Sequence, residues 1–245
     1  MLLDAGAFIT EVSNYSDPVT EMEMHHTLRP VEAIPRLLVA VSKYDHCLNA
    51  LLTKWKSGAL PADIVGVFSN HEECRGIVEW YGLPFHHLPM TSGTKSEQES
   101  QILALIAREK VTLLVLARYM QILSDEFAAT LQGQVINIHH SFLTGFKGAK
   151  PYHQAYERGV KVIGAAAHYV TAELDEGPII VQEVRPVNHQ VSIQQMTHLG
   201  HDIETAALSQ AVRLAFLGQF TFGITQPPSY SYASPTLKRC SSEKY

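Results

Sequence analysis

The chain has 245 residues, of which 46% are hydrophobic and 18% are charged, and its formal net charge is -5. This composition is typical of a globular protein, and the length favours one full domain of about 180–200 residues with a smaller part beside it. The acidic balance argues against a nucleic-acid partner. No apolar run reaches the ~18 residues of a membrane-spanning helix, so no membrane partner is expected.

The first 34 residues are expected to form a β segment of their own. FITEVSNY (8–15) and EMEMHHTL (21–28) have strand-like patterns and are joined by the turn SDPVT. Because two strands alone make a marginal unit, this segment should depend on other structure for its stability.

From Arg36 onward, buried strands alternate with helices. The expected strands are 36–42, 63–70, 112–117 and Val135–His139, and the expected helices are 45–55, about 75–81, and one ending near Lys110 that Ser96 and Glu99 would open as a capping box. This order predicts an α/β fold with a Rossmann-like, mostly parallel sheet and helices on both faces. A ligand should then lie outside the carboxyl ends of the strands.

The pattern changes after Pro151. Two extended stretches, 161–170 and 178–187, flank the short segment TAELDEG, which predicts an antiparallel addition to the sheet. A long closing helix with one apolar stripe follows. From residue 223 the chain is rich in Pro and Ser without periodicity, which indicates a disordered tail. The expected domains are therefore 1–34, a catalytic domain at 35–222, and the tail at 223–245.

Three cysteines, Cys47, Cys74 and Cys240, form no CxxC pair and no even-numbered disulfide framework. The start MLLDAGAFITEV lacks a basic segment followed by an apolar one, so we expect no secretory signal. These features favour a cytoplasmic protein, with a mitochondrial location as the alternative.

The stretch VINIHHSF carries polar residues at the end of a buried strand. Alternate residues of a strand share a face, so Asn137 and His139 should point together while His140 points away. The pair is either a hydrogen-bonded part of the core or part of a site. Asp175, in ELDEGPIIVQ, is either a solvated turn residue or a carboxylate that pairs with His139 and moves protons.

Other chemistries have weaker sequence support. Three HH pairs occur, but no HExxH or Cys/His metal pattern accompanies them, so no metal is expected. Ser141 lacks a GxSxG elbow. Cys47 follows His46 in a stretch that is typical of a structural helix. No dinucleotide or P-loop glycine motif is present.

Long motifs of this chain resemble one enzyme family. VSKYDHCLNALL, FSNH, LARYMQIL, INIHHSF, GAKPYHQAYERGVKVIGAAAHYV and ELDEGPIIVQ are similar to those of formyltetrahydrofolate deformylases over residues 36–219. The resemblance implies hydrolysis of 10-formyltetrahydrofolate to formate and tetrahydrofolate, which supplies formate for purine and one-carbon metabolism. It also implies folate and water as the partners and no cofactor, and leaves a homo-oligomer open.

The resemblance also assigns roles to residues. Asn137, His139 and Asp175 would be the catalytic trio: Asn137 would donate to the formyl oxygen, His139 would add a donor or a proton, and Asp175 would orient or deprotonate the water. His168 would contact this trio and support it without touching the substrate. The folate would contact Met120, Gln121, Ile122, Leu123, Val170, Thr171 and Glu173.

Two alternatives remain open. The first is formyl transfer to an amine, as in glycinamide ribonucleotide formyltransferases. These transferases hold a phosphate on a Gly-rich turn after the first strand, where this chain has SKYDHC without glycine. The second is an inactive folate-binding homologue. It is suggested by an N-terminal segment that resembles only part of an ACT regulatory domain, and by the altered loop at Thr144 and Gly145. Ala166 and His201 are two further departures from the family pattern.

Overall fold

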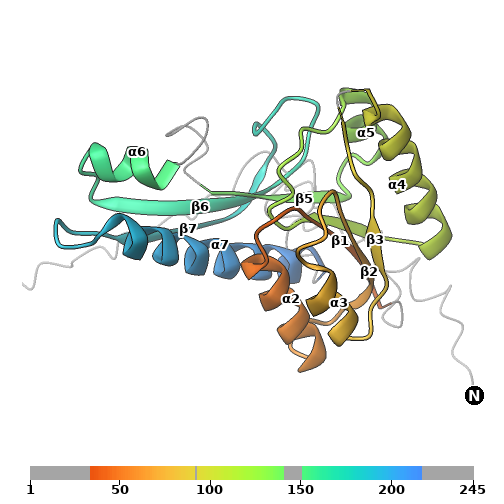
Figure 1. Cartoon of the computed structure of the whole chain (residues 1–245), viewed down its shortest axis with the longest axis horizontal. Coiled ribbons are helices and arrows are strands. Elements are labelled where there is room, and N and C mark those ends of the chain that lie inside the picture. The colour runs from red at the N-terminus through yellow and green to blue at the C-terminus, as the bar shows by residue number, and fades with distance from the viewer. Residues whose placement is uncertain (1–33, 92, 141–150, 217–245) are drawn as a thin grey trace, which may run out of the picture.

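A computed structural model of the protein describes residues 34–91, 93–140 and 151–216. Their strands form one seven-stranded sheet in the order β3-β2-β1-β4-β5-β6-β7 (Figure 1). The strands are β1 (Arg36–Val41), β2 (Asp63–Ser69), β3 (Phe85–His87), β4 (Leu113–Leu116), β5 (Val135–His139), β6 (Val162–Tyr169) and β7 (Ile179–Pro186). The helices are α2 (His46–Lys56), α3 (Arg75–Trp80), α4 (Lys95–Glu109), α5 (Asp125–Thr130), α6 (Pro151–Glu157) and α7 (Ile193–Phe216).

The sheet is parallel from β3 to β5 and antiparallel from β5 to β7. The expected mostly parallel α/β sheet with an antiparallel addition is therefore confirmed. Of the expected β segment, only residue 34 is described. The expected disordered tail at 223–245 lies outside the described residues.

The sequence of β1 is apolar without alternation because the strand is covered on both faces. Leu37, Val39 and Val41 pack in one hydrophobic core with residues of α2, α3 and α7, whereas Leu38 and Ala40 pack in a second core with residues of α4 and α5. Because successive strand residues point to opposite faces, a strand covered on both faces needs apolar residues throughout. Figure 1 shows α2 and α3 on the opposite side of the sheet from α4.

The expected capping box at the start of α4 is wrong. The helix begins at Lys95 with Thr94 as its N-cap, and no side-chain capping hydrogen bond forms, so Ser96 lies inside the helix. The Glu99 carboxylate instead accepts hydrogen bonds from the backbone N and the Oγ of Ser124, at 2.7 and 2.6 Å. Ser124 itself caps α5, because its Oγ accepts from the backbone N of Phe127. The Glu99 carboxylate, which the local pattern assigned to the capping box of α4, therefore forms a tertiary contact with Ser124.

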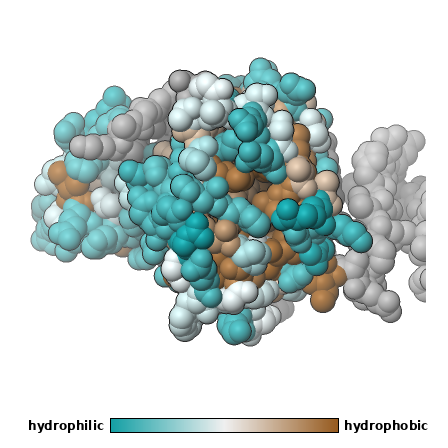
Figure 2. Space-filling view, turned by 45° about the vertical axis from the view of Figure 1, so that its right-hand side comes forward, coloured by the Kyte–Doolittle hydropathy of each residue, from teal (hydrophilic) through white to brown (hydrophobic). Residues whose placement is uncertain are grey.

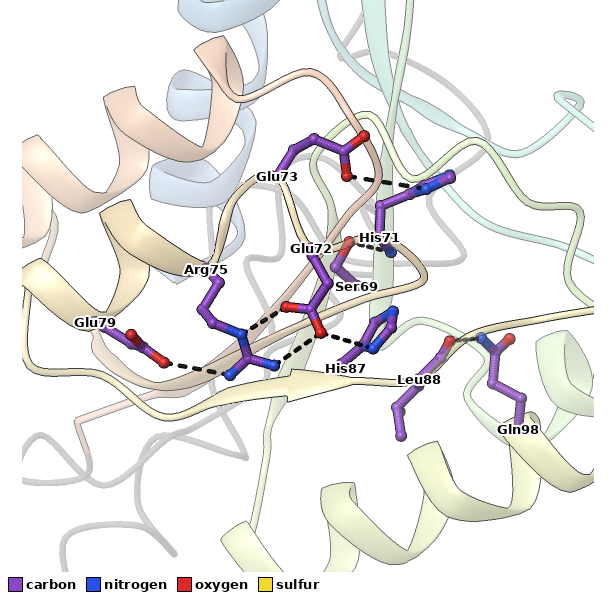
Figure 3. Close-up of polar contacts among 9 residues, drawn as sticks. All are labelled: Ser69, His71, Glu72, Glu73, Arg75, Glu79, His87, Leu88 and Gln98. Carbon is purple, nitrogen blue, oxygen red and sulfur yellow. Dashed lines mark hydrogen bonds and ion pairs between the residues drawn. The ribbon is translucent and has the colours of Figure 1, made fainter.

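A polar cluster follows the carboxyl ends of β2 and β3 (Figure 3). The Glu72 carboxylate accepts hydrogen bonds from the Arg75 guanidinium and lies 2.8 Å from Nδ1 of His87, and Arg75 also reaches Glu79. The hydrogen bonds from Arg75 lower the pKa of Glu72. Because this carboxylate and its partners lie at the surface, the cluster contributes little to stability and mainly orders the edge of the sheet.

The surface seen in Figure 2 is mostly hydrophilic, with hydrophobic residues gathered near the centre of the face. Within the described ranges, none of the helices has the length and apolar character needed to cross a bilayer.

Gly200 provides a test of the packing between α6 and α7. A Cβ built on Gly200 would lie 2.1 Å from Cζ of Tyr152, so Gly200→Ala should destabilise the fold by about 1–3 kcal/mol in urea unfolding. Gly76 is the matched control, since it lies in α3 with nothing within 4 Å of the added Cβ. Gly76→Ala should stabilise by about 0.5–1 kcal/mol. Equal effects of the two changes would contradict the packing described here.

Candidate active site

A cavity of about 510 Å³ opens at the carboxyl ends of β4 and β5, at the edge where the fold was expected to bind its ligand. Its walls come from the ends of these two strands, the segment after β4, and the loop between β6 and β7. Of the residues expected to contact folate, those that line the cavity are Met120, Gln121, Ile122, Leu123, Val170 and Thr171. Glu173 is not among the lining residues; its carbonyl accepts a hydrogen bond from the Thr171 hydroxyl.

Asn137, His139 and Asp175 all line this cavity. The first two lie on β5, and Asp175 comes from the loop between β6 and β7. Nε2 of His139 lies 3.4 Å from Oδ2 of Asp175. Asp175 has a φ of 59°, a left-handed conformation that Asp and Asn adopt more readily than most residues. The tertiary structure thus brings the three sequence-predicted residues to one place.

His168 fixes the orientation of Asn137. Its Nδ1 lies 2.9 Å from the carbonyl oxygen of Tyr169, which only accepts, so Nδ1 carries a proton. Burial lowers the pKa of His168, which favours a neutral ring whose Nε2 is an acceptor. Nε2 lies 3.3 Å from Nδ2 of Asn137, so the Asn137 amide donates one N–H to it. The second N–H of this amide makes no hydrogen bond with a described residue, so it can serve as a donor in the cavity.

The expectation that His140 points away from the site is wrong. His140 lines the cavity, and its ring centroid lies 5.2 Å from that of His139. Strand β5 ends at His139, so the alternation of a strand does not extend to residue 140. Burial, together with the nearby Arg118 and His139, lowers the pKa of His140 to about 4. His140 is therefore a neutral ring at pH 7.

Gly177 allows the Asp175 loop to approach β6. A Cβ at this position would lie 1.7 Å from the carbonyl oxygen of Tyr169, and backbone atoms do not yield as a flexible side chain would. Glycine is therefore required two residues after Asp175 because the chain passes directly over the end of β6. This close approach holds the carboxylate beside His139.

The segment after β4 is tied to two other elements. The backbone N of Met120 donates to Oγ of Ser42 at 3.0 Å, and that hydroxyl donates to Oδ1 of Asn70 at 2.8 Å. The Tyr119 hydroxyl donates to Oε1 of Gln98. These bonds hold the cavity wall in place. Ser42 was missed in the sequence, because nothing in the pattern indicates a partner 78 residues away.

A buried charged cluster adjoins the cavity and was also missed. Glu204, on α7, is 0% exposed, and its carboxylate accepts hydrogen bonds from Nε2 of His46 at 2.7 Å and from the Tyr152 hydroxyl at 2.6 Å. Nε of Arg118 lies 3.3 Å away. Burial would raise the pKa of Glu204, but His46, Arg118 and Tyr152 together outweigh it and lower that pKa. The only sequence signal for this cluster was Glu204 itself, an acidic residue within the apolar stripe of α7.

The same cluster contains a grouping with metal-ligand chemistry. His46, Cys47 and Glu204 each place a ligand atom within 4.8 Å of the others. However, His46 already donates to Glu204, and the Arg118 guanidinium supplies positive charge beside it. Burial raises the pKa of the Cys47 thiol, so it is neither the thiolate that a metal binds nor a nucleophile. This donor set does not fit a cation.

Comparisons with known proteins point to one family. A family model described as formyl transferase matches residues 35–212. A formyltetrahydrofolate deformylase from Corynebacterium sp. (strain P-1) is 52% identical over 201 residues, covering 82% of this chain and 70% of that protein. The Bacillus subtilis (strain 168) protein of the same name is 43% identical over 199 residues, covering 81% of this chain and 66% of the relative. The chain thus spans about two thirds of the length of these relatives.

Comparisons with solved structures point to the same family. The crystal structure of formyltetrahydrofolate deformylase from Burkholderia mallei matches with a TM-score of 0.73 at 51% identity, covering 76% of this chain and 66% of that one. A phosphoribosylglycinamide formyltransferase from Coxiella burnetii matches with a TM-score of 0.71 at 25% identity, covering 78% of this chain and 90% of the other. The fold is therefore similar in hydrolases and transferases, while the sequence is more similar to the deformylases.

The depressed pKa of His140 predicts a loss of stability in acid. As the pH falls below the ordinary histidine pKa of about 6.5, the unfolded chain takes up a proton that the folded chain takes up only near pH 4. Stability should therefore fall with pH in this window, and His140 should contribute about 2 kcal/mol of the loss between pH 7 and pH 5.

Urea unfolding of the wild type and His140→Asn at both pH values measures this contribution. The variant should lose less stability on acidification than the wild type, whereas replacing the exposed His189 by Asn should change nothing. An unchanged acid loss in His140→Asn would contradict the assignment.

Proposed function

Because the chain belongs to the formyl transferase family, and within it to the formyltetrahydrofolate deformylases, we propose that it hydrolyses 10-formyltetrahydrofolate to formate and tetrahydrofolate. The observation that carries the proposal is the meeting of Asn137, His139 and Asp175 in one cavity, with His139 3.4 Å from Asp175. The formate would serve purine and one-carbon metabolism. The reaction needs no cofactor, since the folate is the substrate.

The chemistry follows from the three side chains. Water attacks the formyl carbon, and the second N–H of Asn137 donates to the formyl oxygen as negative charge develops there. Asp175 orients the attacking water, and the proton that this water loses passes through Asp175 to His139, 3.4 Å away. The bond from the formyl carbon to N10 then breaks as N10 takes that proton from His139, which returns both side chains to their starting states. The formic acid loses its proton to solvent, and formate and tetrahydrofolate leave.

The cavity wall suits a planar ring with apolar faces. Met120, Ile122 and Leu174 are large hydrophobic side chains on the cavity wall that are 52%, 63% and 62% exposed. Covering them with the pterin would remove apolar surface from water. Backbone groups of the segment after β4, held by Ser42, would supply the hydrogen bonds. Glu173 stays a predicted contact.

Transfer to an amine has less support. The turn after β1 contains no glycine, and two of its side chains are already engaged: the Ser42 hydroxyl with Met120 and Asn70, and His46 with Glu204. Water is then the remaining nucleophile. Of the departures from the family pattern, Ala166 is buried opposite His139 in the sheet, and His201 stacks on His46 with ring centroids 4.0 Å apart. Thr144 and Gly145 lie outside the described residues.

A cytoplasmic location and the lack of a nucleic-acid partner stay predictions from the sequence, which leaves homo-oligomeric assembly open.

Incubation of the pure protein with 10-formyltetrahydrofolate labelled with ¹³C in the formyl group tests the reaction. We expect ¹³C-formate to appear by NMR without any amine acceptor. Label that leaves the folate only when an amine acceptor is added would show transfer. Binding of the folate without release would show an inactive homologue.

Asn137→Ala and His139→Ala test the assigned roles. Each should lower kcat by about 10²–10³, because a transition-state donor is lost, while folate binding changes little. The matched controls are Asn188→Ala and His189→Ala, which replace the same residue types at exposed positions after β7. Near-normal kcat in either site variant, with the fold confirmed by thermal unfolding, would show that its role is wrong.

A further inference from the structure

Arg118 occupies an unusual position on the wall of the cavity. It follows the end of β4 and has a φ of 64°, in the left-handed region that favours glycine. Its side chain is only 8% exposed. An arginine is a poor choice for this backbone and this burial unless its guanidinium has a specific use.

The surroundings hold the guanidinium but do not use all of its donors. Its Nε lies 3.3 Å from Oε2 of Glu204, and its carbon Cζ lies 5.2 Å from the centroid of the Tyr44 ring. Glu204 also accepts from His46 and Tyr152, so one carboxylate serves several donors. Buried Nε and Nη1 of Arg118 make no hydrogen bond with any residue in the part of the chain that the structure describes.

Arg118 lies on the wall of the cavity that holds the catalytic trio. It lines the cavity together with Asn137, His139 and Asp175. His140 is within electrostatic reach of both Arg118 and His139, since each of them lowers its pKa. The buried cation is therefore close to the place where the proposed reaction would occur.

The chemistry of the product matches this cation. Hydrolysis converts a neutral formyl group into formate, the smallest carboxylate, next to the carboxylate of Asp175. Like charges repel at this site, whereas a guanidinium presents N–H donors in a planar fork that fits a carboxylate. Glu204 approaches the guanidinium at Nε, and Nη1 makes no hydrogen bond with a described residue.

We propose that Arg118 forms a binding site for formate, in which its guanidinium takes up the newly formed carboxylate from the catalytic trio. Glu204 and Tyr44 orient the guanidinium. The inference rests on the proposed function for the identity of the anion. The site itself rests on the buried, incompletely paired arginine in the cavity.

Titration of the resting protein with ¹³C-formate, followed by NMR line broadening, tests binding without turnover. The wild type should bind formate saturably, and Arg118→Met should weaken binding by about tenfold or more, as expected for the loss of a charged hydrogen-bond donor. Arg118→Lys, which keeps the charge but not the fork, should give an intermediate loss. Arg108→Met replaces an exposed arginine on α4 and should bind as the wild type does.

Removing Arg118 alone leaves the buried Glu204 carboxylate with one partner fewer, so the single variant risks misfolding. Arg118→Met/Glu204→Gln removes both charges and should fold, with the same loss of formate binding. Unchanged formate affinity in a folded Arg118 variant, or no saturable binding to the wild type, would overturn the proposal.

Steady-state rates separate this proposal from the proposed function. In the wild type, formate should inhibit hydrolysis, and Arg118→Met should raise the inhibition constant of formate by about tenfold or more while leaving inhibition by tetrahydrofolate unchanged. If the chain releases no formate from the folate but still binds formate through Arg118, the proposed function fails and the anion site stands. If the chain hydrolyses the folate but Arg118→Met leaves the inhibition constant of formate unchanged, the proposed function stands and the anion site fails.

Discussion

The pairing of β5 is the constraint on which the site depends. This strand is parallel to β4 on one side and antiparallel to β6 on the other, with Asn137 opposite both Leu116 and His168. Because β6 is antiparallel to β5, the end of β6 lies beside the start of β5, with Tyr169 opposite Ile136, and the loop after β6 turns back so that Asp175 reaches His139. A register shift of one residue would turn Asn137 and His139 to the other face and separate them from Asp175.

A second constraint is the burial of Glu204. Its carboxylate joins α7 to the start of α2 through His46, to α6 through Tyr152, and to the segment after β4 through Arg118. A buried carboxylate is stable only when donors surround it, so these elements have a fixed arrangement wherever the cluster is intact. The same arrangement holds a cation at the cavity wall. The stability of the fold and the electrostatics of the site therefore depend on the same side chains.

Local rules failed where tertiary contacts replaced them. Glu99 was expected to cap its own helix but accepts from Ser124, because a partner from another element competes for the carboxylate. His140 was expected to leave the site, but the alternation of β5 ends one residue earlier. Arg118 and Ser42 act over long sequence separations, and a pattern of neighbouring residues carries no signal for such contacts.

The sequence by itself determined the order of six of the seven described strands and of helices α2, α3, α4 and α7, the face shared by Asn137 and His139, and, through its motifs, the family; it did not predict β3, α5 and α6. It could do so because burial on both faces of a strand requires continuous apolar runs, and because the period of a strand decides which residues point together. Only the tertiary structure brought Asp175 to His139 and assembled the cluster around Glu204. Those contacts depend on the path of loops and on donors from distant elements, which no local periodicity encodes.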